Sequence, residues 1–598
     1  MCGIVGYAGK RQSLSVLLDG LCRLEYRGYD SSGIAVLSGD QISVVRAKGR
    51  LERLKSEVDK SPPRGRVGIG HTRWATHGAP SVENAHPHLS NDGSFAVVHN
   101  GIIENYAEIR EFLSIRGFDF RSQTDTEVIP NLLEYYYDGD VLGAIVKTAH
   151  KLRGSYALGI IHAGEVDKFY AVRKDSPLVI GIGEGENFIA SDIPAILPYT
   201  NRFCMPDSGE IAVISAHGYA VFNSNLERVN KAVTVSDLDA TSAEKGGYPH
   251  FMLKEIYEQP RALRKALEGR TARENVLSEL KADGKRFRKV FIAACGSAYH
   301  AGEAGKYFIE KYARIETETV LASEFRYRDP IVDDSCLTVI ISQSGETADS
   351  LAALREAKNR GSYVLAIVNA PFSTIAREAD ETLYTRAGPE IAVATTKGYT
   401  TQLALIYLLG LRLARDRGTL ADEEYEAVLS SLESLPENVE AQLKDANTAA
   451  QRLANKYSGV HDAYFIGRGE DRASALEGAL KLKEISYVHA EAYAAGELKH
   501  GTISLIENGT LVVAIDTCPA LRDKTDSNVK EVKARGAAVV RVSECGVGDE
   551  LLTIPLSHPS VSPVYTAVSL QLFAYYSAVA RGCDVDKPRN LAKAVTVE

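Results

Sequence analysis

The chain lacks the features that membrane and secreted proteins need. Its longest strongly apolar run, LALIYLLGL from Leu403, ends at Arg412 and reaches only about half a membrane span. The eight cysteines form no CxxC pair and show no regular spacing, which argues against a disulfide framework. The start does not resemble a signal peptide, because Lys10 and Arg11 interrupt it after few apolar residues. We therefore expect a cytoplasmic protein in which the run from Leu403 is a buried helix.

The chain also lacks an excess of positive charge. It has 69 basic and 78 acidic residues, a net charge of -9 with histidine neutral. Nucleic acids and anionic membranes attract basic surfaces, so we expect neither as a partner. The composition, 45% hydrophobic and 25% charged, is typical of globular proteins. A length of 598 residues is too great for one core, and about three to five domains are expected.

The character of the sequence changes near Lys245. Before about residue 230, short β-rich runs such as SFAVVHNGII and EIAVIS are bounded by turn residues. The stretch HFMLKEIYEQPRALRKAL then has the periodicity of a long amphipathic helix, and we interpret it as a linker element. After it, strand, turn and helix patterns alternate, as expected for parallel α/β units.

The second half of the chain contains an internal repeat. KVFIAACGSAYHAGEAGKYF near residue 290 aligns with DAYFIGRGEDRASALEGALK near residue 462. LTVIISQS from Leu337 aligns with TLVVAIDT from Thr510, an offset of 173 residues (510 − 337). Two tandem copies of one α/β domain are therefore predicted, and the last ten residues, RNLAKAVTVE, fall outside both copies.

Cys2 directly follows Met1, and two explanations are open. The position is an accident of the start site, or this cysteine must become the N-terminus. Removal of Met1 would give Cys2 a free α-amine, whose usual pKa is roughly 7.7–8.0, beside its own thiol. The amine could then take the thiol proton, so that base and nucleophile lie in one residue.

Five further segments form a recognisable pattern with MCGIVGY. They are YRGYDSSG (26–33), GHTRWATHG (70–78), NAHPH (84–88), HNGIIEN (99–105) and TDTEV (124–128). Together these segments resemble the class II glutamine amidotransferase domain, which has an N-terminal-nucleophile (αββα) fold. The resemblance spans the first third of the chain.

This resemblance implies that Cys2 attacks the side-chain amide of glutamine. Asn100, through its side-chain amide, and Gly101, through its backbone N–H, would stabilise the resulting oxyanion. Arg73 would bind the α-carboxylate of glutamine with its guanidinium fork, and Asp125 would bind the α-ammonium group.

Other residues of the same region receive roles from the resemblance. Trp74, the only tryptophan of the chain, would belong to a mobile loop that gates an ammonia channel. Without the flanking motif, a half-buried core aromatic would be the simpler explanation. Thr76 and His77 would contribute to the glutamine pocket.

Five of the fourteen histidines lie within thirty residues: His71, His77, His86, His88 and His99. A metal site is one explanation, because neutral histidine is a common ligand. The region has no HExxH motif and no cysteine partner, and the His-Pro-His spacing suits a loop. We therefore expect a hydrogen-bonding scaffold around the glutamine pocket and no metal.

The first repeat contains a candidate phosphate loop. VIISQSGETADSLAALREAKNRG reads as a buried strand, a hydroxyl-rich loop and a helix, whose N-terminus can bind phosphate. An ordinary capped turn is the alternative. The stretch is similar to the sugar isomerase (SIS) phosphosugar signature, which implies that the hydroxyl-rich loop binds a hexose phosphate through Ser342, Gln343, Ser344 and Thr347.

The SIS resemblance extends to three other places. Ser297 in ACGSAYHAG matches a hydroxyl that contacts the phosphate, whereas Ala298 stands where relatives usually carry another. Val393 and Ala592 are placed near the sugar by the same analogy. The second repeat has DTCPAL where the first has SQSGET, so one sugar site per chain is expected.

A second block of the chain carries candidate catalytic groups. In ALEGALKLKEISYVHAEAYAAGELKHG, Glu477, Lys481 and Glu484 are spaced to share one stripe of a helix. A solvated stripe of salt bridges is the alternative. The block and the tail resemble the isomerase domain of glutamine–fructose-6-phosphate aminotransferases. This implies that His500 opens the sugar ring with help from Glu477, that Glu484 moves a proton between C1 and C2, and that Lys593 forms a Schiff base.

The resemblance as a whole implies an α/β and α+β multidomain enzyme: a glutaminase domain and two tandem SIS domains, each with a parallel sheet in three αβα layers. It would be a cytoplasmic homodimer that uses glutamine and fructose 6-phosphate, with no cofactor, nucleic acid or membrane partner. Another amidotransferase or a sugar-phosphate sensor are the rivals. The expected divisions are 2–220 (amidotransferase), 221–283 (linker), 284–425 and 453–588 (SIS), and 589–598 (catalytic tail).

Overall fold

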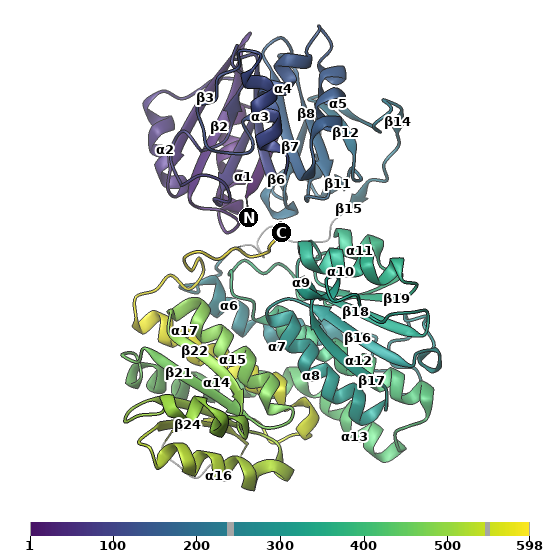
Figure 1. Ribbon diagram of the computed structural model, residues 1–598, viewed down its shortest axis with the longest axis vertical. Coiled ribbons are helices and arrows are strands. Elements are labelled where there is room, and N and C mark those ends of the chain that lie inside the picture. The colour runs from purple at the N-terminus through teal and green to yellow at the C-terminus, as the bar shows by residue number, and fades with distance from the viewer. Residues whose placement is uncertain (1, 236–243, 545–549, 597–598) are drawn as a thin grey trace. The chain divides into compact units, whose positions relative to one another are not determined.

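The computed structural model describes residues 2–235, 244–544 and 550–596 (Figure 1). The chain divides into two compact units. Of the described residues, those up to Glu244 and the tail from Ala592 form the first unit, and those from Lys245 to Leu591 form the second.

Two antiparallel sheets form the centre of the first unit. The first sheet has the strand order β15 (Thr234–Val235), β11 (Arg202–Cys204), β9 (Val179–Ile182), β10 (Glu186–Ala190), β1 (Gly3–Gly9), β4 (Val67–Arg73), β2 (Ser31–Ser38) and β3 (Gln41–Lys48). The second has the order β14 (Arg228–Val229), β13 (Gly218–Phe222), β12 (Glu210–Ser215), β8 (Lys168–Lys174), β7 (Gly154–His162), β6 (Phe95–Ile103) and β5 (His88–Leu89).

Alternating side chains of β1 show why these sheets form four layers. Ile4 and Ala8 belong to a core between the two sheets, whereas Val5 and Tyr7 pack on the helices outside. The outer helices of the first sheet are α1 (Ser13–Leu24) and α2 (Leu51–Lys60). Those of the second sheet are α3 (Tyr106–Ser114), α4 (Val128–Tyr136) and α5 (Val141–Lys151). The predicted αββα fold is confirmed.

Two parallel five-stranded sheets form the second unit, and their strand orders correspond. One has the order β17 (Glu316–Leu321), β16 (Lys289–Ala294), β18 (Cys336–Ser342), β19 (Tyr363–Val368) and β20 (Glu381–Tyr384). The other has β22 (His489–Ala494), β21 (Asp462–Gly467), β23 (Leu511–Asp516), β24 (Ala538–Ser543) and β25 (Leu551–Thr553). The shared order confirms the repeat that the sequence predicted.

Helices cover both faces of each parallel sheet. In the first repeat they are α8 (Ser297–Tyr312), α9 (Ala322–Phe325), α10 (Ala348–Asn359), α11 (Thr374–Glu378) and α12 (Lys397–Arg417). In the second they are α15 (Asp471–Ser486), α16 (Arg522–Lys533) and α17 (Ser562–Ala580). Two further helices, α13 (Asp422–Glu433) and α14 (Leu435–Lys456), lie between the repeats in the sequence.

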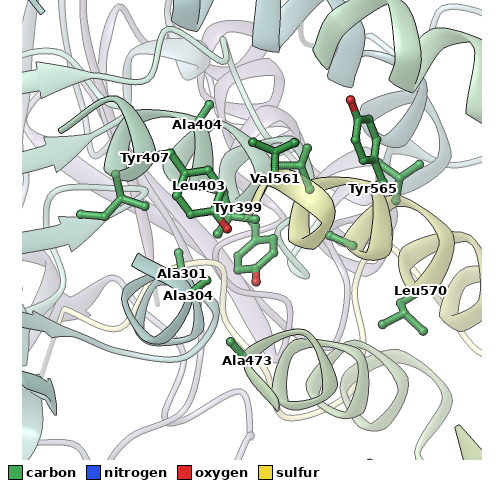
Figure 2. Packing of buried hydrophobic residues seen from close by; sticks show 14 of the residues in the cluster. Ala301, Ala304, Tyr399, Leu403, Ala404, Tyr407, Ala473, Val561, Tyr565 and Leu570 are labelled. Carbon is green, nitrogen blue, oxygen red and sulfur yellow. The ribbon is translucent and has the colours of Figure 1, made fainter. Parts of the chain in front are cut away.

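One apolar core continues through both repeats. Figure 2 shows Ala301 of α8, Tyr399 and Leu403 of α12, Ala473 of α15 and Leu570 of α17 within it. The run from Leu403 is thus a buried helix, as predicted. In the described ranges no helix is long and apolar enough to span a membrane.

The stretch interpreted as a linker forms two helices instead of one. They are α6 (Phe251–Tyr257) and α7 (Gln259–Leu267), which meet at Glu258. Pro260 explains the break, because it has no N–H for a continuous helix but suits the first turn of a new one. Met252 and Leu263 join the core of the second unit.

Candidate active sites

The pairing of β1 with β4 brings the candidate nucleophile to its neighbours. Gly3 lies opposite Thr72, so Cys2 lies beside the end of β4. The backbone N–H of Trp74 donates to the Cys2 Sγ at 3.3 Å. Burial raises the pKa of the Cys2 thiol, while the Trp74 N–H and the nearby Arg73 act to lower it. A base is therefore needed to form the thiolate.

Asn100 and Gly101 lie on β6 next to the backbone of the nucleophile. The Asn100 Nδ2 donates to the Cys2 carbonyl at 3.0 Å and to the Ser191 Oγ at 2.8 Å. Gly101 has φ of 126°, and a Cβ there would lie 2.0 Å from the Ser155 carbonyl oxygen. Only glycine fits this position, because any side chain would clash with the backbone of the neighbouring strand β7.

The guanidinium group of Arg73 has a buried N–H donor without a hydrogen-bond partner among the described residues. Its Nη2 donates to the His77 and Gly78 carbonyls, while its Nη1 is buried without a hydrogen-bond partner among the described residues. Burial lowers its pKa, and the thiol of Cys2 and the carboxylate of Asp125 act in the opposite direction. A substrate carboxylate would satisfy the unpaired donor.

Asp125, also buried, accepts a hydrogen bond from the Ile103 N–H at 2.8 Å. Trp74 is half-buried and Thr76 is exposed on the loop after β4. His77 lies on the same loop, where its ring contacts Tyr106 edge-on.

The other four histidines form one buried cluster. The rings of His71 and His86 stack at 4.2 Å, and those of His88 and His99 lie close to His86. The His71 Nε2 bonds the Asn100 Oδ1 at 3.0 Å. Burial lowers the pKa of all four and brings that of His71 to about 3, so they are neutral near pH 7. This arrangement supports the interpretation as a scaffold.

The hydroxyl-rich loop of the first repeat joins β18 to α10. The Ser342 and Thr347 hydroxyls bond each other at 3.0 Å, and the Gly345 N–H donates to the Ser342 Oγ at 3.0 Å. The Ser344 Oγ accepts from the Glu346 N–H at 3.2 Å. The Gln343 carbonyl accepts from the Asn369 N–H at 3.1 Å. Hydroxyls thus gather at the N-terminus of a 12-residue helix, which suits a phosphate.

The charged stripe of α15 is buried, not solvated. Glu477 and Lys481 have side chains exposed by only 2% and 1%, and Glu484 by 20%. The Lys481 Nζ lies 2.6 Å from the Glu484 Oε2 and 3.7 Å from the Glu477 Oε1. Burial acts to lower the pKa of Lys481, but both carboxylates outweigh it and the pKa is raised. Buried charges of this kind are typical of functional sites.

Known proteins match this chain both in its separate domains and over its full length. Residues 286–412 and 456–580 match the SIS domain model, and residues 71–198 match the glutamine amidotransferase domain model. The chain is 52% identical over 610 residues to the glutamine–fructose-6-phosphate aminotransferase (isomerizing) of Clostridium acetobutylicum, with 100% of both chains covered. The protein of that name from Thermus thermophilus is 49% identical over 606 residues, again with 100% of both chains covered.

The chain belongs to the glutamine–fructose-6-phosphate aminotransferase family.

A solved structure agrees with this assignment for the second unit. The C-terminal domain of the Francisella tularensis glucosamine-fructose-6-phosphate aminotransferase is 40% identical, with a TM-score of 0.56. It covers 58% of this chain and is itself covered completely. The family and fold class that the sequence motifs predicted are confirmed.

Other residues assigned by resemblance to this aminotransferase family come from three further segments of the chain. His500 is exposed at the end of the short helix η4 (Glu497–His500), and within the described ranges no hydrogen bond or ion pair joins it to Glu477. Val393 is buried, and its N–H donates to the Asp586 carbonyl at 3.0 Å. Lys593 and Ala592 belong to the tail that groups with the first unit. Their roles stay predictions.

In the second repeat, the loop after β23 corresponds to the hydroxyl-rich loop of the first. Its polar groups are bonded to side chains of the same repeat. The Asp471 carboxylate accepts from the Thr517 N–H at 3.0 Å and from its hydroxyl at 2.5 Å. Asp516 pairs with the Arg541 Nη1 at 3.0 Å. This arrangement supports the expectation of one sugar site per chain in a member of this family.

One residue of the Glu477 site was missing from the sequence-based set. His300 lies on α8, and its Nδ1 bonds the Glu477 Oε2 at 2.9 Å. It follows Ser297 by three positions on a helix, so both lie on one face. This three-residue spacing was the one feature of the sequence that could have pointed to His300.

Proposed function

We propose that this protein transfers the amide nitrogen of glutamine to fructose 6-phosphate and isomerises the product to glucosamine 6-phosphate, releasing glutamate. The reaction would be the first committed step of amino-sugar (UDP-N-acetylglucosamine) synthesis. The observation that carries the proposal is the full-length match to aminotransferases of this name. The Cys2 site and the buried Glu477 stripe supply side chains suited to each half of the reaction.

The glutamine half begins at Cys2. Its thiolate attacks the side-chain carbonyl carbon, and the oxyanion takes hydrogen bonds from the Asn100 amide and the Gly101 N–H. The tetrahedral intermediate expels ammonia, which receives the proton that the α-amine took from the thiol. Water then cleaves the thioester and gives glutamate. Arg73 and Asp125 hold the α-carboxylate and α-ammonium groups.

The sugar half uses the second unit and the tail. Ser297 and the loop that carries Ser342, Gln343, Ser344 and Thr347 hold the phosphate. His500 opens the ring with help from Glu477, and the Lys593 amine forms an imine at C2 with loss of water. Ammonia displaces Lys593 from C2. Glu484 then removes a proton from C1 and returns one to C2, which gives the amino-aldose.

Water balances over the two halves of the reaction, because hydrolysis of the thioester consumes one molecule and formation of the imine releases one. No cofactor is required by these steps. We further propose that ammonia passes Trp74 on its way to the sugar, and that the protein is a cytoplasmic homodimer. Residues 2–220 would form the amidotransferase domain and 589–598 the catalytic tail.

The test is a product assay with the purified full chain, glutamine and fructose 6-phosphate. Glutamate and glucosamine 6-phosphate in equal amounts are expected. Glutamate alone would show that the acceptor is wrongly assigned. Neither product, in a preparation shown by mass spectrometry to have lost Met1, would favour a sugar-phosphate sensor.

A further inference from the structure

The carboxylate of Glu477 receives donors from two helices. The Ser297 Oγ donates to its Oε1 at 2.9 Å, and the His300 Nδ1 bonds its Oε2 at 2.9 Å. Both donors come from α8 of the first repeat, whereas Glu477 lies on α15 of the second. Each oxygen of the carboxylate thus has a separate donor on the facing helix.

Lys481, on the helix of Glu477 itself, is a weaker partner. Its Nζ lies 3.7 Å from the Glu477 Oε1, but 2.6 Å from the Glu484 Oε2. A distance of 3.7 Å is too long for a hydrogen bond. No bond to the Oε2 other than that of His300 is present in the described part of the chain. His300 therefore decides how this oxygen is held.

The chemistry of the pair defines the histidine tautomer. An ionised carboxylate can only accept hydrogen bonds, so the His300 Nδ1 must carry the proton that it shares with Glu477. The His300 side chain is 12% exposed and that of Glu477 is 2% exposed, so water competes little with the bond. A buried carboxylate that loses such a donor is free to turn toward other partners, among them Lys481.

We propose that His300 is a positioning residue for the sugar half of the reaction. Its Nδ1–H holds the Glu477 carboxylate in one orientation against α8, where Glu477 can help His500 to open the sugar ring. This inference rests on the function proposed above. It assigns His300 a hydrogen bond to Glu477 and no contact with the sugar.

Two substitutions separate this role from simple packing. His300→Leu keeps much of the side-chain volume but removes the donor, and His300→Asn is smaller but keeps an N–H donor near the Nδ1 position. We expect kcat for glucosamine 6-phosphate to fall about 10- to 100-fold in His300→Leu, the loss typical of a hydrogen bond to a charged group. His300→Asn should retain kcat within about threefold of the unmodified protein, since it keeps that donor.

The KM for fructose 6-phosphate should change little in both variants, since the phosphate loop is intact. The exposed His461 provides a matched control, and His461→Leu should leave all values unchanged. Glutamate release without sugar, which needs only the first unit, should be the same in all proteins.

Three results would overturn the inference. The first is an unchanged kcat in His300→Leu. The second is a loss of kcat in His300→Asn as large as that in His300→Leu. The third is a larger loss in His300→Asn than in His300→Leu, which would be expected if His300 acted only by filling space. The proposed function fails in a different way: the unmodified protein itself would then form no glucosamine 6-phosphate.

Discussion

At the scale of single residues, the first unit places hydrogen-bond donors at and near Cys2. Trp74 supplies a backbone N–H to the sulfur, and Asn100 donates to the Cys2 carbonyl. Arg73 has one buried donor without a partner in the part of the chain that the structure describes. Under the proposed function, Cys2, Asn100 and Arg73 are the nucleophile, an oxyanion donor and a ligand for the glutamine carboxylate. The residue types were predicted from the motifs, whereas the unpaired Arg73 Nη1 is visible only in the structure.

The nucleophile gives the simplest residue-scale prediction. Cys2→Ala removes the sulfur proposed to attack glutamine, so glutamate release should fall by at least about 10³-fold. Cys22→Ala, at an exposed free cysteine, is the matched control and should retain full activity. Amino-acid analysis of glutamate over time measures both. Substantial release by Cys2→Ala would assign the nucleophile elsewhere.

A second prediction concerns the oxyanion. In Asn100→Ala, kcat for glutamate release should fall about 10²- to 10³-fold, as expected for the loss of one oxyanion donor. The KM for glutamine should change much less, because Arg73 and Asp125, the residues proposed to hold the α-groups, are unchanged in this variant. Initial rates over a range of glutamine concentrations separate the two constants. A change confined to KM would contradict the oxyanion role.

At the scale of elements, the sequence predicted which residues share a helix face, but not whether that face is buried. The spacing of Glu477, Lys481 and Glu484 predicted one stripe on one helix, and α15 confirms it. The alternative of a solvated stripe was wrong, because the Glu477 and Lys481 side chains are exposed by only 2% and 1%. Two residues of α8, Ser297 and His300, bond the Glu477 carboxylate. Glu477 and His300 are 177 residues apart, and no local pattern shows which distant helix will pack on a stripe. The spacing from Ser297 could place His300 on the same helix face, but it could not show that this face packs against Glu477.

The buried stripe makes a stability prediction. Lys481→Met would leave two carboxylates on α15 without their shared cation, so the free energy of unfolding should fall by about 3–5 kcal/mol. The exposed Lys483 on the same helix is the matched control, and Lys483→Met should change it by less than about 0.5 kcal/mol. Denaturant titrations followed by circular dichroism provide the comparison. Equal stability of the two variants would contradict the arrangement described for α15.

The histidine cluster predicts how the first unit responds to acid. The pKa of His71 is lowered to about 3, below the value near 6.5 of an unfolded histidine, and the other three are lowered too. Below pH 6.5 the unfolded chain therefore binds protons that the folded unit does not. Stability is complete above about pH 6.5 and falls by about 1.4 kcal/mol per pH unit for each such histidine as the pH decreases.

Trp74 makes this measurement specific, because it is the only tryptophan and lies in the first unit. Its fluorescence should report a thermal midpoint that decreases from pH 6.5 toward pH 5. His71→Gln should show a shallower decrease. A midpoint independent of pH in this range would mean that the cluster is not neutral when folded.

At the scale of the whole molecule, two folds with different chemistry share one chain. The αββα unit and the pair of parallel α/β repeats were both predictable, because dense motifs marked the first and an internal repeat marked the second. The division at Pro260 and the continuous core through both repeats were not predicted. The continuous core depends on contacts between segments that lie far apart in the sequence, whereas Pro260 was a local sign of the helix break.

The central claim is that nitrogen passes from glutamine to the sugar within this protein. The most direct test is incubation with amide-15N glutamine, fructose 6-phosphate and an excess of unlabelled ammonium, followed by mass spectrometry of the sugar product. We predict glucosamine 6-phosphate that carries the 15N label undiluted. Product diluted to the isotope ratio of free ammonium would contradict direct transfer, and absence of the amino sugar would contradict the proposed function.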